Sequence, residues 1–408
     1  MTDARRIVIV GGGPAGVGAA LAARAQDASA EIVLISDEAC EPYEKPPLSK
    51  AVLIGKAKPH DAPVAGRGGV AAHKVAFQRG TRVRAIDRAA RAVVTESGER
   101  IPYDALVLAS GSINRMLPMF PPGPGLYYLR TAEEALALKA HLDRSRSLLV
   151  IGGGLIGLEV AASAAELGVK TTVIEIAPRI LARVCDEETS ALIHRRHLAH
   201  GVDLRIGTAI ATLTLLADGR RAVTTKAGDT FAADLIVVGT GVAPDDALAK
   251  AAGLAVQDGI LVDEHCHTSD PAIFAAGDCT RIPGPNGPVR LENWRHAQEH
   301  GAIAGRNAAG GEAAYNTAPS FWSEQYDMYI QGVGWPGAQP SARISRQIGP
   351  NAMMLFDLDG ARLACAMGIN AQRDIAAARR LIERRVPVDI ADLTDPAKPL
   401  AAMLKAKV

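Results

Sequence analysis

The chain has few cysteines, and none of them stands in a redox or metal-binding spacing. Its 408 residues include five, with no Cys-x-x-Cys pair among them: Cys40, Cys185, Cys266, Cys279 and Cys365. A dispersed, odd set of this kind is typical of reduced, mostly buried thiols in an intracellular protein. We therefore predict neither an iron–sulfur cluster within the chain nor the paired cysteines of a disulfide reductase.

Net charge and long apolar runs are also missing. Lys and Arg number 45 against 44 Asp and Glu, a net charge of +1, which gives no overall attraction to nucleic acid or membrane. No run of about 18 apolar residues occurs, and residues 1–6 lead directly into a strand pattern. Residues 194–200 contain three histidines, but no carboxylate or thiol completes a metal site. We expect a soluble, cytoplasmic protein that binds no metal.

The main feature that is present is a Gly-x-Gly-x-x-Gly turn between a strand and a helix. A short apolar run leads into Gly152, Gly154 and Gly157, and an Ala-rich helix and a second strand follow, ending in Glu175. The glycines let the backbone approach a pyrophosphate, and the helix N-terminus supplies the positive end of a dipole. An acid about 20 residues further on holds a ribose 2′-hydroxyl. Glu175 therefore predicts NADH rather than NADPH.

The same pattern occurs once before, at the N-terminus. A strand at 6–10 leads into the turn residues Gly11, Gly13, Pro14, Ala15 and Gly16, and a second strand ends beside Asp37. Two such folds starting about 140 residues apart indicate FAD in the first and a nicotinamide nucleotide in the second. Asp37 is then the acid expected to bind the FAD ribose. The predicted fold class is α/β, with two Rossmann-like dinucleotide-binding domains.

A proline-rich segment after the first fold carries a more specific signal. The run from Tyr43 to Lys50, Tyr-Glu-Lys-Pro-Pro-Leu-Ser-Lys, resembles that of the FAD-dependent ferredoxin reductases of bacterial oxygenase systems, the putidaredoxin reductase and biphenyl dioxygenase reductase type. Three later runs resemble the same family: Tyr-Asp-Ala-Leu-Val-Leu-Ala-Ser-Gly at 103–111, Ile-Phe-Ala-Ala-Gly-Asp at 273–278 and Pro-Ser-Phe-Trp-Ser-Glu-Gln-Tyr at 319–326. The resemblance covers nearly the whole chain and fits least well at residues 55–80.

The resemblance implies which residues act at the flavin. Lys50 would lie beside the flavin and pair with Glu159, and Trp322 would lie near the flavin and the ferredoxin-facing surface. With the motifs above, the residues expected to bind FAD are Gly11, Gly13, Pro14, Ala15, Gly16, Asp37, Lys45, Lys50, Val83, Ala109, Gly111, Arg130, Gly277, Asp278, Glu292, Trp294 and Ala297. Those expected to bind NAD are Gly152, Gly154, Leu155, Ile156, Gly157, Glu159, Glu175, Arg183 and Gly241.

The resemblance also implies domains and an activity. The expected domains are an FAD-binding domain at 1–111 and 245–314, an NAD-binding domain at 112–244, and a C-terminal α+β domain at 315–408. The implied reaction takes electrons from NADH through FAD to a [2Fe–2S] ferredoxin, which supplies a Rieske dioxygenase or a haem-thiolate monooxygenase. A basic helix near Arg379–Arg385 is either a solvated face or part of a docking patch for an acidic ferredoxin.

Two alternative functions remain open at this point. An NADH oxidase, peroxidase or disulfide reductase would need a cysteine poised at the flavin, and Cys40 is the only candidate in that neighbourhood. A redox-sensing flavoprotein related to apoptosis-inducing factor would instead use its NADH-linked redox state to regulate a partner. Fast turnover with a ferredoxin would separate an enzyme from such a sensor.

Overall fold

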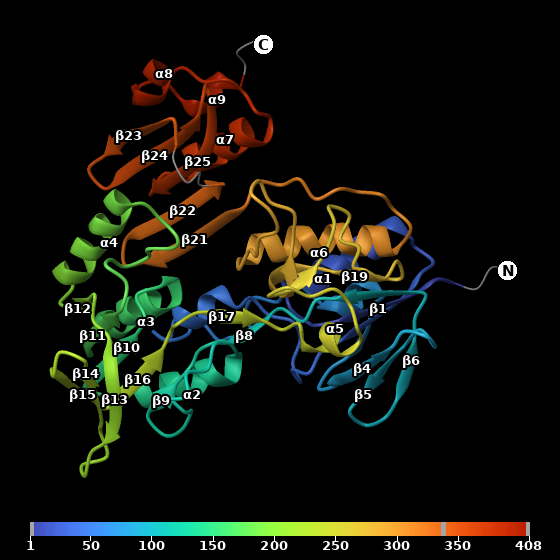
Figure 1. The fold of residues 1–408 in the computed structure, drawn as a ribbon, viewed down its shortest axis with the longest axis horizontal. Coiled ribbons are helices and arrows are strands. Elements are labelled where there is room, and N and C mark those ends of the chain that lie inside the picture. Colours follow the sequence, from blue (N-terminus) through green and yellow to red (C-terminus); the bar gives the residue numbers. More distant parts are fainter. Residues whose placement is uncertain (1–3, 336–339, 405–408) are drawn as a thin grey trace. The chain divides into compact units, whose positions relative to one another are not determined.

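The computed structural model describes residues 4–335 and 340–404, which form two compact units (Figure 1). The first unit contains the described residues up to Glu44, together with His60–Ile113 and Val242–Pro319. The second contains Lys45–Pro59, Asn114–Gly241 and the described residues from Ser320 onward. Each unit holds one of the two expected dinucleotide folds, so that part of the fold prediction is confirmed.

The first unit is built on a parallel five-stranded sheet with the order β19-β7-β1-β2-β3. Its strands are β1 (Arg6–Val10), β2 (Glu31–Ile35), β3 (Ala76–Gln78), β7 (Ala105–Leu108) and β19 (Ile273–Ala275). The middle of β1 and all of β7 are buried, as continuous apolar runs are in parallel sheets covered on both faces. The expected strand at 6–10 is therefore the central strand of a Rossmann-like sheet.

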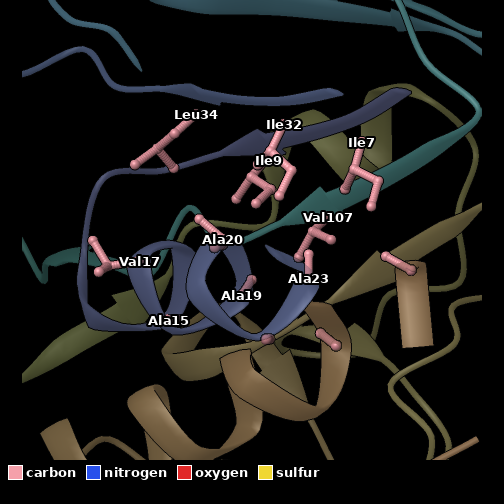
Figure 2. Packing of buried hydrophobic residues seen from close by; sticks show 14 of the residues in the cluster. Ile7, Ile9, Ala15, Val17, Ala19, Ala20, Ala23, Ile32, Leu34 and Val107 are labelled. Carbon is pink, nitrogen blue, oxygen red and sulfur yellow. The ribbon is translucent and has the colours of Figure 1, made fainter. Parts of the chain in front are cut away.

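Two helices pack on each other beneath this sheet: α1 (Pro14–Gln26) and α6 (Trp294–Ala308). Figure 2 shows the apolar side chains of the strands directed toward the alanines of α1. A Cβ at Gly301 would lie 2.0 Å from the carbonyl oxygen of Ala15, and one at Gly305 would lie 1.9 Å from that of Ala19. Only glycine lets the two helix backbones approach this closely.

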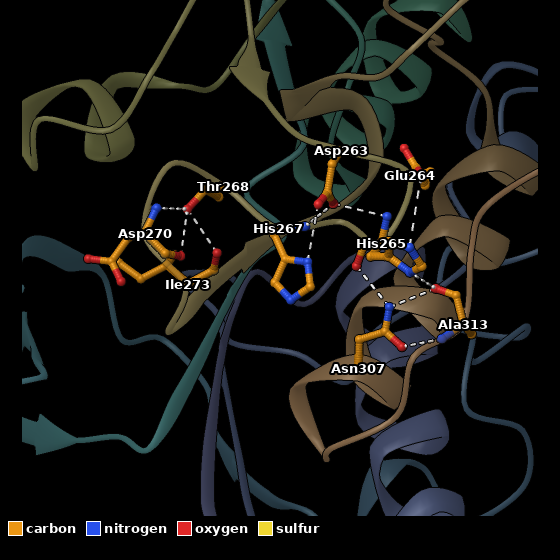
Figure 3. A network of polar contacts seen from close by, with 9 residues as sticks. All are labelled: Asp263, Glu264, His265, His267, Thr268, Asp270, Ile273, Asn307 and Ala313. Atoms are coloured by element: carbon orange, nitrogen blue, oxygen red, sulfur yellow. Dashed lines mark hydrogen bonds and ion pairs between the residues drawn. The ribbon is translucent and has the colours of Figure 1, made fainter.

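In the first unit, hydrogen bonds of the Asn307 side chain hold the segment that follows α6 (Figure 3). The Asn307 side chain donates to the carbonyl oxygens of His265 and Ala313, both at 2.8 Å, and accepts from the Ala313 N–H at 2.7 Å. The remaining elements of this unit are η2 (Val70–His73), β4 (Val83–Asp87), β5 (Ala92–Thr95), β6 (Arg100–Pro102), β17 (Val242–Pro244), α5 (Ala247–Ala251), β18 (Ile260–Leu261), η3 (Gly277–Cys279) and β20 (Thr280–Arg281). Strand β8 (Ser112–Asn114) lies where the chain passes into the second unit.

The second unit repeats the parallel arrangement in a sheet with the order β12-β11-β10-β16-β9. Its elements are η1 (Pro46–Ser49), β9 (Leu126–Tyr127), α2 (Ala132–Leu142), β10 (Ser147–Ile151), α3 (Leu155–Glu166), β11 (Lys170–Glu175), α4 (Glu187–Ala199), β12 (Asp203–Ile206), β13 (Ile210–Leu215), β14 (Arg221–Thr225), β15 (Thr230–Ala233) and β16 (Leu235–Val238). Segment 45–59 joins this unit because Leu53 lies in its core and the Ser163 hydroxyl donates to the Ser49 carbonyl oxygen at 2.8 Å.

An antiparallel sheet with helices completes the second unit. Its strand order is β21-β22-β25-β24-β23. The elements are β21 (Ser320–Gln325), β22 (Met328–Gly334), β23 (Ala342–Gly349), β24 (Ala352–Asp359), β25 (Arg362–Ile369), α7 (Gln372–Glu383), α8 (Ile390–Thr394) and α9 (Leu400–Met403). Leu158 of α3 and Ile193 of α4 share one buried cluster with Ile330 and Met353. The C-terminal sheet and the second dinucleotide fold therefore have a common core.

Candidate functional site

The first glycine turn has the shape that a pyrophosphate requires. Gly11 adopts φ +118°, and a Cβ there would lie 2.1 Å from the carbonyl oxygen of Ala109. A Cβ at Gly16 would lie 1.8 Å from the Gly11 carbonyl oxygen, so this glycine seats α1 against the turn. A Cβ at Gly13 would meet nothing within 4 Å. The turn is therefore closed toward the protein and open at the helix N-terminus, where Pro14 occupies the first position.

The turn before η3 comes to the same helix end. A Cβ at Gly277, which has φ +80°, would lie 2.8 Å from the Ala15 Cβ and 3.5 Å from the Ala297 Cβ. The structure therefore brings together three residues expected to bind FAD from sequence positions far apart. Gly111, also with positive φ at +74°, follows β7 at the same end of the strand as Ala109.

Asp37 lies two residues after the last residue of β2 and is exposed. Its Oδ2 accepts from an Arg82 guanidinium nitrogen at 3.1 Å. Val83 follows Arg82 and begins β4, where it pairs with Thr95. The pKa of Asp245 is raised by burial and by the negative charge of Asp37. Arg82 therefore neutralises one member of an acidic pair at the place where a ribose is expected.

The other expected FAD residues of the first unit lie around η3 and the start of α6. Asp278 Oδ2 accepts from the Ser112 hydroxyl at 3.0 Å. Trp294 is the first residue of α6, and burial raises the pKa of the nearby Glu44 carboxyl. Glu292 accepts from Arg290 at 2.6 Å.

The second glycine turn matches the first. Gly152 has φ +106°, and a Cβ there would lie 2.6 Å from the Gly239 carbonyl oxygen. A Cβ at Gly157 would lie 2.1 Å from the Gly152 carbonyl oxygen, whereas one at Gly154 would meet only the Gly239 oxygen at 3.9 Å. Leu155 and Ile156 form the first turn of α3, and Ile156 is 45% exposed. Both turns therefore fit a dinucleotide pyrophosphate.

Glu175 ends β11 and is tied to the turn through both carboxylate oxygens. Oε2 accepts from the Gly153 N–H and Oε1 from the Ala177 N–H, each at 2.6 Å. Arg183 and Gly241 lie together, since a Cβ at Gly241 would be 3.3 Å from an Arg183 guanidinium nitrogen. The carboxylate is thus fixed at the strand end where a ribose 2′-hydroxyl would bind, and a 2′-phosphate would meet its negative charge.

Lys50 and Glu159 form an ion pair in the second unit. Lys50 Nζ lies 3.1 Å from Glu159 Oε2, which also accepts from the Ser49 hydroxyl. Glu159 Oε1 accepts from the Ser323 hydroxyl of β21 at 2.6 Å. The Glu159 side chain is 3% exposed, so this charge survives burial only with such partners.

The remaining predicted residues also lie in the second unit. Lys45 precedes η1, and Trp322 lies on β21 opposite Gln331 of β22. The Arg130 N–H donates to Glu134, whose carboxylate completes the capping box of α2. Their roles toward the flavin stay predictions.

Four of the five cysteines, all except Cys40, are thiols whose surroundings argue against nucleophilic chemistry. All five cysteines are free thiols. Burial raises the pKa of Cys185 and Cys365 to about 12 and of Cys279 to about 11, and it raises that of Cys266 as well. A protonated thiol is a poor nucleophile. The described residues also contain no group of His, Cys, Asp and Glu arranged to hold a metal, and no helix among them is long and apolar enough to span a bilayer.

Sequence reasoning missed several residues that hold the predicted ones. Arg82 pairs with Asp37, and Ser323 binds Glu159. His300, buried in α6, accepts the Gly277 N–H through Nδ1 at 3.2 Å. A signal for Ser323 existed, because Ser323 and Gln325 lie two residues apart in a strand and so share one face with the aromatic Phe321.

Comparison with known proteins places the chain. A family model described as pyridine nucleotide-disulphide oxidoreductase matches residues 5–301, and one described as reductase C-terminal matches residues 320–404. The chain is 41% identical over 401 residues to the anthranilate 1,2-dioxygenase system ferredoxin–NAD(+) reductase component of Burkholderia cepacia, covering 97% of this chain and 98% of that protein. It is 35% identical over 413 residues to putidaredoxin reductase of Pseudomonas putida, covering 98% of each.

A solved structure gives the same result. The reductase chain in the crystal structure of the covalent putidaredoxin reductase–putidaredoxin complex matches with a TM-score of 0.93 at 35% identity, covering 99% of both chains. The fold class predicted from the sequence, including the C-terminal α+β domain, is confirmed. The chain belongs to the pyridine nucleotide-disulphide oxidoreductase family, as an FAD- and NADH-dependent oxidoreductase of the ferredoxin–NAD(+) reductase type.

Proposed function

We propose that this protein is an NADH-dependent ferredoxin reductase that passes electrons from NADH through FAD, one at a time, to a [2Fe–2S] ferredoxin. The observation that carries the proposal is the pair of dinucleotide turns in a chain whose cysteines offer no reactive pair. FAD, when bound, accepts a hydride from NADH and releases its electrons singly. Turnover by this route therefore needs no reactive thiol.

The residues of the chain bind the two nucleotides, select NADH and orient the groups near the flavin. The turns at Gly11 and Gly152 present the N-termini of α1 and α3 to the two pyrophosphates. Glu175 selects NADH through its fixed carboxylate. By the resemblance, Lys50, oriented by Glu159, places a positive charge where negative charge develops on the reduced flavin. Trp322 is proposed to shape the flavin edge.

The partner is proposed from the relatives, whose names place them in oxygenase systems. We infer that this chain likewise supplies a terminal oxygenase, a Rieske dioxygenase or a haem-thiolate monooxygenase, through its ferredoxin. On α7 and just after it, exposed arginines are available to an acidic ferredoxin, namely Arg373, Arg380, Arg384 and Arg385, whereas Arg379 is paired with Glu383. Five free thiols support a reducing compartment, the cytoplasm.

The domain division expected from the sequence is also proposed: FAD binding by 1–111 and 245–314, NAD binding by 112–244, and a C-terminal domain from 315. The matched C-terminal family model begins at residue 320. Tyr315 belongs to the first unit, where its hydroxyl lies 2.9 Å from His296 Nδ1.

The test is anaerobic stopped-flow reduction of the FAD-loaded protein by NADH and, separately, by NADPH, followed by mixing with oxidised [2Fe–2S] ferredoxins. We expect fast bleaching by NADH, slow bleaching by NADPH, and electron transfer to at least one ferredoxin. Reduction followed only by fast reoxidation with oxygen or peroxide would favour an oxidase or peroxidase, and Cys40→Ser would then be the next variant. Reduction with no fast acceptor would favour a sensor.

A further inference from the structure

A chain of hydrogen bonds extends from the buried Glu159 carboxylate across the second unit. Ser323 donates to Glu159 at 2.6 Å, and Gln325 Nε2 donates to the Ser323 hydroxyl oxygen at 3.0 Å. His197 Nε2 lies 2.8 Å from Gln325 Oε1, and the Tyr326 hydroxyl lies 3.1 Å from His197 Nδ1. Three sequence-distant elements, α3, α4 and β21, contribute to this single chain.

The chemistry of the groups fixes the direction of every bond. An amide oxygen can only accept, so His197 must carry its proton on Nε2 and donate to Gln325. Neutral His197 then has only a lone pair at Nδ1, and the Tyr326 hydroxyl must donate to it. Every donor therefore faces inward, from Tyr326 toward the Glu159 carboxylate, and bonds aligned in this way polarise and strengthen one another.

Burial preserves these hydrogen bonds and their donor directions. Ser323 and His197 are 0% exposed and Gln325 is 1% exposed, so an unpaired group here would cost the full desolvation penalty. Burial also lowers the pKa of His197 to about 4, which leaves the ring neutral in neutral solution. His200, which is not part of this series of hydrogen bonds, stacks on Tyr326 with ring centroids 3.8 Å apart.

We propose that His197 is a positioning residue for the Lys50–Glu159 ion pair, acting through Gln325 and Ser323. The proposal rests on the function proposed above, because it assigns His197 a part in reduction by NADH. His197 touches neither Lys50 nor a nucleotide turn. Its role is to fix the rotamer of Gln325, and with it the Ser323 hydroxyl that holds one oxygen of Glu159 while Lys50 holds the other. The same bonds fix β21, the strand that carries Trp322.

The main test compares His197→Leu with His197→Gln in the FAD-loaded protein. The Leu variant leaves Gln325 Oε1 without its donor, and we expect flavin reduction by NADH to slow roughly tenfold. The Gln variant can supply an amide N–H near the Nε2 position and should restore most of the rate. His194→Leu, on the same helix but outside the chain of bonds, is the matched control and should leave the rate unchanged.

A double-mutant cycle distinguishes positioning from general damage. If His197 acts through Glu159, His197→Leu should lose most of its effect in a Glu159→Gln background, where the carboxylate is already gone. Equal effects in both backgrounds, or equal slowing by His194→Leu, would overturn the proposal. A protein that NADH does not reduce at all would instead overturn the proposed function.

A second measurement does not depend on turnover. Imidazole ¹⁵N spectra of the wild-type protein without FAD should show His197 with a protonated Nε2 and a bare Nδ1 at pH 7. His300, which accepts the Gly277 N–H at Nδ1, should show the same pattern, and the His197 signal is the one that should be absent from His197→Gln. A His197 protonated on Nδ1 would contradict the bond directions on which the proposal depends.

Discussion

In the first unit helix α1 packs along α6, whereas in the second unit helix α3 carries a buried carboxylate and packs against strand β21. The glycine turns before the two helices are nearly identical, with φ of +118° at Gly11 and +106° at Gly152. The elements that pack on the two helices differ. Helix α1 contains no carboxylate and contacts the backbone of α6 at Gly301, whereas the Glu159 carboxylate of α3 accepts hydrogen bonds from hydroxyl groups. The two turns therefore share the geometry that fits a dinucleotide, and the two helices differ in the elements that pack on them.

The strongest way to break this comparison is to fill the third glycine of each turn. A Cβ at Gly16 or Gly157 would lie 1.8 Å or 2.1 Å from a carbonyl oxygen, so Gly16→Val and Gly157→Val should each deform one turn. We expect a loss of about 3 kcal/mol or more in the affected nucleotide's binding, a hundredfold or larger.

The two readouts are FAD bound per chain and NADH affinity. Gly16→Val should lose FAD, whereas Gly157→Val should retain the flavin spectrum and lose NADH. Loss of FAD from Gly157→Val with NADH binding intact would reverse the assignment of the two folds.

Acid pH should lower the stability of both units, because each contains buried neutral histidines. Burial lowers the pKa of His197 to about 4 in the second unit and of His296 to about 3 in the first, and it lowers that of His300 as well. Because an unfolded histidine titrates near 6.5, the unfolded chain binds protons first as the pH falls. Stability should be full above about pH 6.5 and fall toward pH 4, by up to about 1.4 kcal/mol per pH unit for each histidine.

Urea unfolding between pH 7 and pH 5 measures this slope. His197→Gln should flatten it by about one proton, while His194→Gln, as the control, should flatten it less. An unchanged slope in His197→Gln would mean that His197 already carries a proton in the folded protein.

The parts of the site that the sequence predicted are those with local signals. Glycine spacing, a strand-end acid and a helix-forming run lie within about 25 residues of each other, so a βαβ unit is visible in the sequence. Lys50 and Glu159 are 109 residues apart, and only the family resemblance connected them. His197 and Gln325 are 128 apart, and each alone is an ordinary helix or strand residue. Such pairs depend on tertiary packing, which no local pattern encodes.

A smaller effect is expected at His300, which holds Gly277 beside the N-terminus of α1. His300 Nδ1 accepts the Gly277 N–H, and its burial keeps the ring neutral so that it can accept. His300→Leu would leave that N–H unpaired beside Asp278, and we expect FAD affinity to fall roughly twentyfold. His300→Gln offers a side-chain oxygen instead and should recover most of the affinity. FAD titration of the apoprotein measures both, and equal affinities of the two variants would show that the bond to Gly277 does not matter for FAD binding.

The smallest expected effect separates the two strand-end acids. Glu175 accepts backbone N–H groups with both oxygens, whereas exposed Asp37 is paired with the Arg82 side chain. Glu175→Gln removes the charge that opposes a 2′-phosphate and turns an NH₂ group toward a backbone N–H. The preference for NADH over NADPH should therefore fall about tenfold, with NADH itself bound less tightly. Asp37→Asn should weaken the binding of FAD and leave the preference for NADH over NADPH unchanged. If Asp37→Asn changed nucleotide preference and Glu175→Gln did not, the second turn would not be the NADH site, and the different anchoring of the two acids would have no bearing on which nucleotide each one selects.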